Sequence, residues 1–428
     1  MSLTSSVGLT VLFMVDFINI IFISWLKDAE LTAAVGYAGA ILFFTTSFGI
    51  GMSIAASALV ARAVGRGDPD EARTKATNAV IWGVLFGVVF VILMCLNLRT
   101  LVNLLGAEGR TADQAVQYLL IVVPTLPLLM VGMIGGAILR SHGDAKRAMM
   151  ATIYGGLANA ALDPIFIFTL DLELTGAAIA TVLARFVIAG TALLPVIRHH
   201  GGFDRPSWES LRNDLRPISM IAAPAILTQL ATPVGQAFVT RVVSDFGEAA
   251  VAGVAITGRM TPVAFGVIFA LSGAIGPIIG QNYGAGKMDR VREAFVEGLR
   301  FTALFTLLVS ALLFMLRSPI ADLFQATGVT RQIIYLFCGP LALLFFFNGV
   351  IFVANSAFNN LGYPFHSTWT NWGRHTVGTI PLALVGGMWF GAQGVLLGQA
   401  AGGMLFGLVA WWLALRVMPK SPRDVPPA

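Results

Sequence analysis

Long apolar runs recur along almost the whole chain, and they constrain its fold more than any other feature. Each run is about 20 residues long, which lets a helix cross about 30 Å of hydrocarbon. We expect about twelve such segments, with cores near 6–25, 36–60, 77–98, 118–139, 149–170, 175–197, 217–240, 251–279, 299–316, 333–352, 370–390 and 395–415. The runs do not alternate apolar and polar residues as the strands of membrane barrels do. The sequence therefore predicts an all-α integral membrane protein.

Composition and charge placement agree with a membrane protein. Of the 428 residues, 57% are hydrophobic and 11% are charged, whereas soluble domains carry about 25% charged residues. Most of the 27 Lys and Arg residues lie in the loops after every second segment and at the C-terminus. The positive-inside rule then predicts a multi-pass protein of the plasma (inner) membrane with both termini cytoplasmic. This bias also explains the net charge of +5, so no nucleic-acid partner is needed.

The two halves of the chain resemble each other across a central polar stretch. Gly67 and Asp70 align with Gly286 and Asp289 at a shift of 219, and further small residues align at similar shifts. An even number of segments in each half predicts a parallel repeat, related by a pseudo-two-fold axis along the membrane normal. We expect two six-helix lobes with these bounds: an N-lobe at 1–198, a cytoplasmic linker at 199–213, a C-lobe at 214–418 and a tail at 419–428.

Several motifs resemble catalytic or binding sites but lack the required context. The stretch GQNYGAGK ends in Lys287, but the spacing and the following residue do not fit a phosphate-binding loop. The pair His199 and His200 has no further metal ligand nearby, and Cys95 and Cys338 lie in apolar runs as small buried side chains. We therefore expect that the protein is not an enzyme and holds no cofactor and no structural metal. We also expect a monomer.

Two acidic residues stand inside apolar runs, Asp16 and Asp163. A charged side chain at mid-bilayer costs about 2.5–3.5 kcal/mol on insertion scales, so such residues are functional candidates. Asn159 precedes Asp163 by four residues, which places both side chains on one helix face. Gly155 continues that face and leaves room for a close neighbour. Pro164 removes a backbone donor and predicts a kink.

Other polar residues complete the inventory of the membrane segments. Thr181 offers a hydroxyl in the next segment, Arg185 follows one turn later, and Asn19 lies near Asp16. The two carboxylates predict either a shared, exchangeable proton or a set of oxygen ligands for a small cation. A third interpretation is that Asp163 caps a kink and pairs with Arg185.

Four features together resemble the multidrug and toxic compound extrusion (MATE) family, with its DinF-like branch the nearest match. They are the stretch LDPIFIF after a GDAK loop, the paired glycine loops, the stretch TGAAIAT and the VDF…FIS segment. The resemblance covers essentially the whole chain. It implies a twelve-helix exporter driven by H+ or Na+, with a cation site formed by Asp16, Asn159, Asp163 and Thr181. Asn19, Pro164 and Arg185 would modulate that site. The acidic C-lobe residues of the NorM-like branch are missing here, and Met1 stands where relatives have an early proline.

We predict cation-coupled export of small drug-like compounds that are amphipathic and cationic, with membrane lipid as the only other partner. Met260, Phe265 and Asn348 are predicted to line the substrate cavity, although Arg259 and Arg374 would favour an anionic group in the C-lobe. The alternatives are a flippase for lipid-linked oligosaccharides or precursors, an importer or channel, and a polytopic membrane enzyme.

Overall fold

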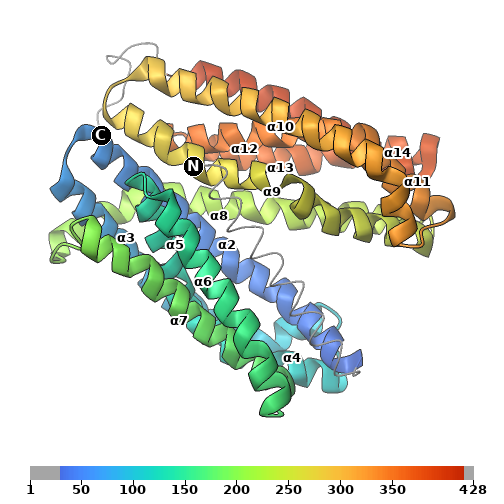
Figure 1. The fold of residues 1–428 in the computed structure, drawn as a ribbon, viewed down its shortest axis with the longest axis horizontal. Coiled ribbons are helices and arrows are strands. Elements are labelled where there is room, and N and C mark those ends of the chain that lie inside the picture. The colour runs from blue at the N-terminus through green and yellow to red at the C-terminus, as the bar shows by residue number, and fades with distance from the viewer. Residues whose placement is uncertain (1–28, 419–428) are drawn as a thin grey trace. The chain divides into compact units, whose positions relative to one another are not determined.

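The structure is a computed structural model that describes residues 29–418, and the regular secondary structure in that range is entirely helical. The first helices, shown from blue to green in Figure 1, belong to the first half of the chain. Their bounds are α2 (Ala29–Arg66), α3 (Pro69–Leu104), α4 (Gly109–Val122), η1 (Val123–Thr125), α5 (Leu126–Ser141), α6 (Ala145–Pro164), η2 (Ile165–Thr169) and α7 (Glu173–His199).

The remaining helices run from yellow-green to red in Figure 1. Their bounds are α8 (Trp208–Ser244), α9 (Glu248–Gly284), α10 (Met288–Leu323), α11 (Gly328–Leu336), η3 (Phe337–Leu341), α12 (Ala342–Leu361), α13 (Pro364–Gly373), η4 (Arg374–Gly378) and α14 (Thr379–Val417). The segments η2, η3 and η4 are short π-helices that continue a neighbouring α-helix.

Within residues 29–418, ten helical stretches are long and apolar enough to cross a membrane. The last of them, Pro364–Val417, is 54 residues long and is interrupted at Phe390 and Gly391, whose backbone angles are not helical. Gly378 and Gly402 lie close together on either side of this interruption, so the stretch folds back and crosses twice. The segment predicted at 6–25 lies outside the described residues, so the number twelve stays a prediction.

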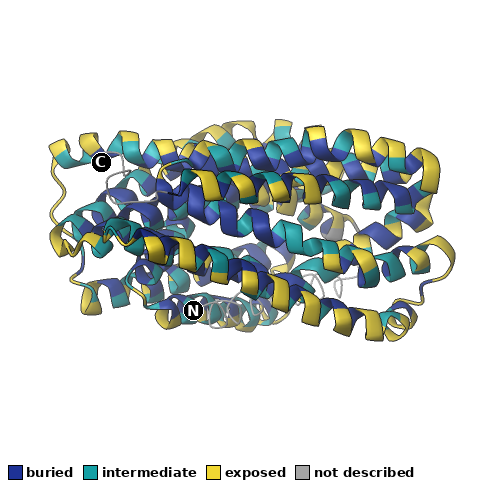
Figure 2. Cartoon of the chain, turned by 90° about the horizontal axis from the view of Figure 1, so that it is seen from above, coloured by how far each residue is buried: buried dark blue, intermediate teal, exposed yellow. Residues whose placement is uncertain are grey.

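The described chain divides between Ile226 and Leu227 into two compact units. The division lies inside α8, whose first half packs its Ile218, Ile221 and Ala222 into the core of the N-terminal unit. Figure 2 shows buried residues on the inward sides of the helices and exposed residues on their outer sides. The assignment of 199–213 as the linker between two functional lobes stays a prediction.

The backbone confirms the internal repeat. Left-handed conformations, which favour glycine, occur at matching turns of the two halves. At a constant shift of 219 they pair Gly67 with Gly286, Gly106 with Gln325, Gly109 with Gly328, and Gly143 with Gly362. The stretch GQNYGAGK therefore holds the end of α9 and the turn into α10, with Asp289 in the first turn of α10 as Asp70 is in α3.

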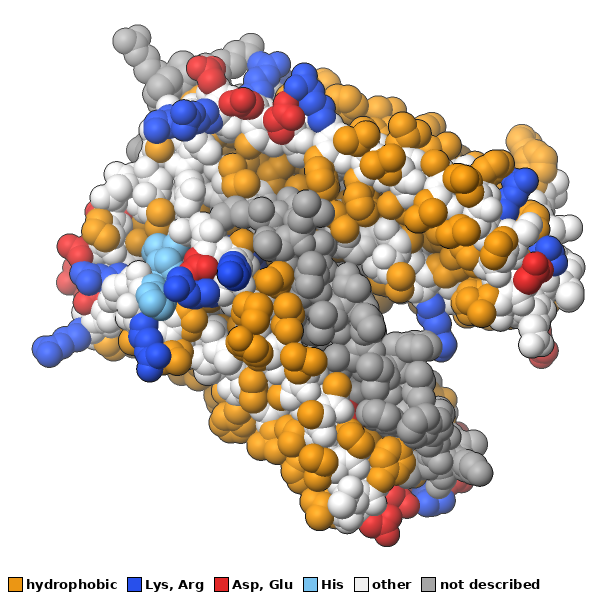
Figure 3. All heavy atoms as spheres, in the orientation of Figure 1, with side chains coloured by type: hydrophobic (Ala, Val, Ile, Leu, Met, Phe, Trp, Pro, Cys, Tyr) orange, Lys and Arg blue, Asp and Glu red, His pale blue; other side chains and the backbone are white. Residues whose placement is uncertain are grey.

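Charged and apolar side chains separate along the helices. Figure 3 shows apolar side chains along the flanks of the helices and charged side chains near the helix ends. Among the exposed apolar residues are Leu96 and Leu104 in α3 and Leu308 and Met315 in α10. Such flanks suit contact with hydrocarbon, because lipid tails are as apolar as these side chains.

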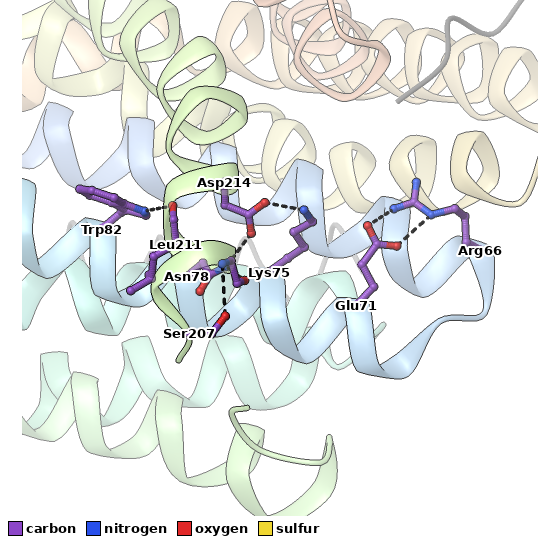
Figure 4. A network of polar contacts seen from close by, with 9 residues as sticks. Arg66, Glu71, Lys75, Asn78, Trp82, Ser207, Leu211 and Asp214 are labelled. Atoms are coloured by element: carbon purple, nitrogen blue, oxygen red, sulfur yellow. Dashed lines mark hydrogen bonds and ion pairs between the residues drawn. The ribbon is translucent and has the colours of Figure 1, made fainter. Parts of the chain in front are cut away.

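The start of α8 is tied to α3 by buried polar contacts (Figure 4). Asp214 accepts hydrogen bonds from Lys75 Nζ at 2.5 Å and from Asn78 Nδ2 at 2.7 Å, and it is 3% exposed. Trp82 Nε1 donates to the carbonyl of Leu211 at 2.9 Å. A carboxylate this buried is stable only because both of its oxygens are paired.

We expect Asp214→Ala to lower the free energy of unfolding by about 2–3 kcal/mol, because it removes the acceptor of the Lys75 ammonium and one of the two acceptors of the Asn78 amide, the other being Ser210 Oγ. Thermal unfolding of the purified protein in detergent measures this loss. Glu209→Ala is the matched control, since Glu209 is an exposed acid in the first turn of the same helix. Equal unfolding temperatures for the two variants would contradict a stabilising role for the Asp214 contacts.

The polar loop residues form an ordinary surface cluster. His200 Nε2 lies 3.2 Å from Asp144, and its ring lies 4.7 Å from the His142 ring between centroids. Burial and the neighbouring His200 lower the pKa of His142. Burial raises the pKa of Asp144, but hydrogen bonds from Arg147 and His200 outweigh it and hold that pKa below its usual range. Among residues 29–418, no group of three His, Cys, Asp or Glu side chains is placed to hold a metal ion.

Candidate cation site

The central feature of the N-terminal unit is a buried carboxylate on α6. Asp163 is 1% exposed, and Asn159 Nδ2 donates a hydrogen bond to its Oδ1 at 3.1 Å. The four-residue spacing therefore places the two side chains together, as the sequence predicts. Asp163 lies 18 residues after Ala145, or about 27 Å along the helix at 1.5 Å per residue. It is therefore nearer to the predicted outer end of α6 than to its middle.

The backbone changes its winding immediately after Asp163. Pro164 ends the α-helix, and Ile165–Thr169 continues it as a π-helix. Pro164 has no N–H to donate to the preceding turn, and π-helical segments are frequent at functional sites. Gly176 at the start of α7 lies against this segment, because a Cβ added there would lie 2.5 Å from the Phe166 carbonyl oxygen.

The helix α7 lies beside α6 and supplies the neighbouring polar groups. The predicted close approach at Gly155 is confirmed, since a side chain there would collide with Ile188 of α7. Thr181 Oγ1 donates to the carbonyl of Ala177 in its own helix at 2.9 Å. The donor of that hydroxyl is thus used locally, which leaves its oxygen lone pairs as acceptors.

The structure rules out pairing between Asp163 and Arg185. Arg185 is buried, and its Nη1 donates to the Val122 carbonyl and to Thr125 Oγ1, both at 2.7 Å. In the short turn η1 the Leu126 N–H donates to the carbonyl oxygen of Val123. The neighbouring carbonyl, that of Val122, accepts its hydrogen bond from Arg185. The interpretation in which Asp163 merely pairs with this guanidinium is wrong. Arg185 instead stabilises the turn between α4 and α5.

Two members of the predicted site, Asp16 and Asn19, lie outside the described residues. The meeting of Asp16 with Asp163 therefore stays a prediction. Within residues 29–418, the structure brings Asn159 and Asp163 together and places Thr181 on the adjacent helix.

The predicted substrate-cavity residues separate in the C-terminal unit. Phe265 is fully buried and stacks on Phe345 at 4.0 Å between ring centroids. It interrupts α9 with a non-helical backbone and belongs to an apolar core against which Met260 also packs. Phe265 does not line a cavity in this structure, because its side chain has no exposed surface, and its place in the substrate cavity stays a prediction. Asn348 instead accepts a hydrogen bond from Arg374 Nη1.

Sequence reasoning named Arg374 and Asn348 as candidates but did not anticipate the other polar residues near them. His375 is buried beside it, and Asn371 Nδ2 donates to Asn355 Oδ1 at 3.2 Å. Ser367 Oγ donates to Asn359 Oδ1 at 3.3 Å. The available signal was the four-residue spacing, which places Asn355 with Asn359 and Asn371 with His375 on common helix faces.

Comparison with known proteins decides the family. The model of the family described as MatE matches residues 5–165 and again 224–385, once in each half of the chain. This chain belongs to the MATE family. The double match agrees with the shift of 219 between the matching turns. Members of this family are transporters and not enzymes, so the MATE chain is a multi-pass transporter of small molecules.

Relatives and solved structures support the assignment along nearly the whole MATE chain. An FAD transporter of Shewanella oneidensis is 27% identical, with 97% of this chain and 93% of the relative covered. A probable multidrug resistance protein NorM of Thermotoga maritima is 25% identical, with 79% and 75% covered. The structure of the MATE transporter VcmN of Vibrio cholerae matches with a TM-score of 0.92 at 24% identity, covering 97% of this chain and 94% of that one. This last likeness concerns the fold.

Proposed function

We propose that this MATE transporter exports amphipathic organic compounds in exchange for H+ or Na+, by alternating access in the inner membrane. The observation that carries the proposal is the buried Asp163, held by Asn159 directly before a π-helix. In the membrane such a carboxylate needs a proton or a cation to offset its charge. Both termini are proposed to be cytoplasmic, because most Lys and Arg residues lie in the loops on that side. The protein is proposed to be a monomer.

The coupling follows from differential binding. A cation changes the equilibrium between two conformations only if it binds one of them better. A cation at Asp163 alters the charge beside η2, where Gly176 of α7 contacts the backbone of Phe166. We infer that cation binding changes the packing of these helices and so favours release of the substrate. The position of Asp163 toward the predicted outer end of α6 fits entry of the cation from outside.

The substrates proposed first are cationic amphipathic compounds, because a cation competes directly with the coupling ion at Asp163. Export of flavin nucleotides is a second candidate, favoured by the alignment with the FAD transporter of Shewanella oneidensis over nearly the full chain. Any flippase activity on lipid-linked precursors would require a much larger head group to pass.

The coupling ion is tested with proteoliposomes under an imposed pH gradient or an imposed Na+ gradient. We expect one of the two ion gradients to drive accumulation of ethidium against the ethidium gradient. Collapse of that ion gradient by an ionophore should stop the accumulation. Liposomes without protein are the control. Ethidium movement that follows only its own gradient in both conditions would contradict coupled export.

A further inference from the structure

Within residues 29–418, one buried arginine of the C-terminal unit has no acidic partner. Arg374 is 6% exposed, and its guanidinium keeps its charge because it is not deprotonated in proteins. Among residues 227–418, every acidic side chain is exposed and none of them forms an ion pair with Arg374. These acids are Asp245, Glu248, Asp289, Glu293, Glu297 and Asp322.

The hydrogen bonds of Arg374 leave donors unused. Nη1 donates to Asn348 Oδ1, and Nη2 donates to His375 Nε2 at 2.5 Å. A guanidinium can only donate, so Nε2 is the acceptor and the ring proton of His375 is on Nδ1. Within the described residues, Arg374 Nε and His375 Nδ1 are both buried without a hydrogen-bond partner. Two buried N–H donors therefore adjoin one uncompensated positive charge.

The local backbone holds these two side chains in place. Arg374–Gly378 is a π-helix, and Thr379 Oγ1 donates to the Arg374 carbonyl at 2.9 Å. Gly235 of α8 leaves room for the imidazole, because a Cβ added there would collide with His375 Nδ1, the nearest ring atom, and would lie 2.5 Å from Cγ. Buried charges and unpaired donors destabilise a fold, and in membrane segments they mark functional sites.

We propose that Arg374 and His375 bind an oxyanion, a phosphate or a carboxylate, carried by the exported compound. The planar guanidinium fork matches the oxygens of such a group, and the His375 Nδ1–H supplies a further donor. Amphipathic aromatic compounds that bear a phosphate would thus be substrates. This inference deepens the proposed export function and rests on it.

The depth of Arg374 favours a transported compound over a membrane lipid as the source of the oxyanion. Arg374 follows Pro364 by ten residues, or about 15 Å along the helix. The helix runs on to the interruption at Phe390, a further 24 Å or so. Arg374 is therefore inside the hydrocarbon region of about 30 Å, below the level of lipid headgroups. Secondary transporters bind their substrates at such depths.

The test measures equilibrium binding of two flavins to the purified full chain in a nonionic detergent. Flavin mononucleotide and riboflavin share the ring system and differ by one phosphate. We expect wild-type protein to bind the phosphorylated flavin about 10- to 100-fold more tightly, because hydrogen bonds to a charged group change an affinity by about this factor. Arg374→Gln should remove most of this preference, and Arg374→Lys should keep part of it because the charge remains.

Arg300→Gln is the matched control, since Arg300 is exposed on α10 and pairs with Glu297. Unchanged ethidium binding by Arg374→Gln would show that this variant is folded. Equal affinity of the wild type for both flavins, binding of neither, or a full preference in Arg374→Gln would overturn the proposal. So would loss of the preference on adding phosphatidylglycerol, which would assign the site to a lipid headgroup.

The flavin binding experiment and the ion-gradient experiment can contradict their two proposals independently. If ethidium accumulates under an ion gradient but the flavins bind equally, only the oxyanion site is wrong. If the wild type prefers the phosphorylated flavin but neither gradient drives ethidium, the coupling is wrong and the oxyanion site remains.

Discussion

Asp163→Asn is expected to reduce gradient-driven efflux of ethidium about 100-fold, because coupling free energies of 1–3 kcal/mol correspond to factors of about 5 to 150. The amide keeps the shape of the side chain and a partner for Asn159, but it neither releases a proton nor offsets the charge of a cation. Efflux from cells or vesicles that carry each variant at equal abundance measures the effect.

Asp171→Asn is the matched control for this result. Asp171 lies in the exposed loop after η2, eight residues beyond Asp163, and its backbone is left-handed with φ of 53°. Asn tolerates that conformation well, so the variant should fold and transport normally. Wild-type efflux by Asp163→Asn would remove this carboxylate from the coupling mechanism.

Gly398→Ala is expected to lower the stability of the transporter by about 2–3 kcal/mol, although Ala is the better helix former. The two arms of the hairpin 364–417 approach backbone to backbone, and a Cβ at Gly398 would collide with the Leu382 carbonyl and lie 2.6 Å from Ala383 N. Backbone atoms cannot move aside as a side chain can, so the arms must separate. Gly402 against Gly378, and Gly394 against Gly386, repeat the same close contact.

The control for the hairpin variant is expected to be more stable than the wild type, whereas Gly398→Ala is expected to be less stable. Gly273→Ala in α9 adds a Cβ with nothing within 4 Å, and replacing a helical Gly by Ala gains about 0.5–1 kcal/mol. Thermal unfolding in the same detergent compares the two variants. If Gly398→Ala were as stable as Gly273→Ala, close backbone packing would not hold the hairpin together.

The sequence predicts the helical segments and the turns well because their causes are local. Apolar runs of membrane length become helices, and Gly67 and Gly286 take the left-handed backbone that the aligned loops require. The contact between Asn159 and Asp163 follows from helix geometry alone. These features depend on residues that are close together in the chain.

The features that the sequence does not predict depend on distant residues. The two acceptors of Arg185 are the Val122 carbonyl at the end of α4 and Thr125 Oγ1, 63 and 60 residues away, so no local pattern reveals them. Phe265 is one of many phenylalanines, and only the packing of α9 against other helices shows that it is buried. The burial of His375 likewise depends on a distant residue, because its imidazole packs at Gly235 of α8.

The most direct test of cation coupling at Asp163 is ion movement driven by substrate alone. Proteoliposomes are prepared with an ethidium gradient and no ion gradient, and internal pH and internal Na+ are followed with fluorescent indicators. We expect H+ or Na+ to move opposite to ethidium in the wild type and in Asp171→Asn, and not in Asp163→Asn. Countermovement of the ion at the wild-type rate in Asp163→Asn would contradict the account.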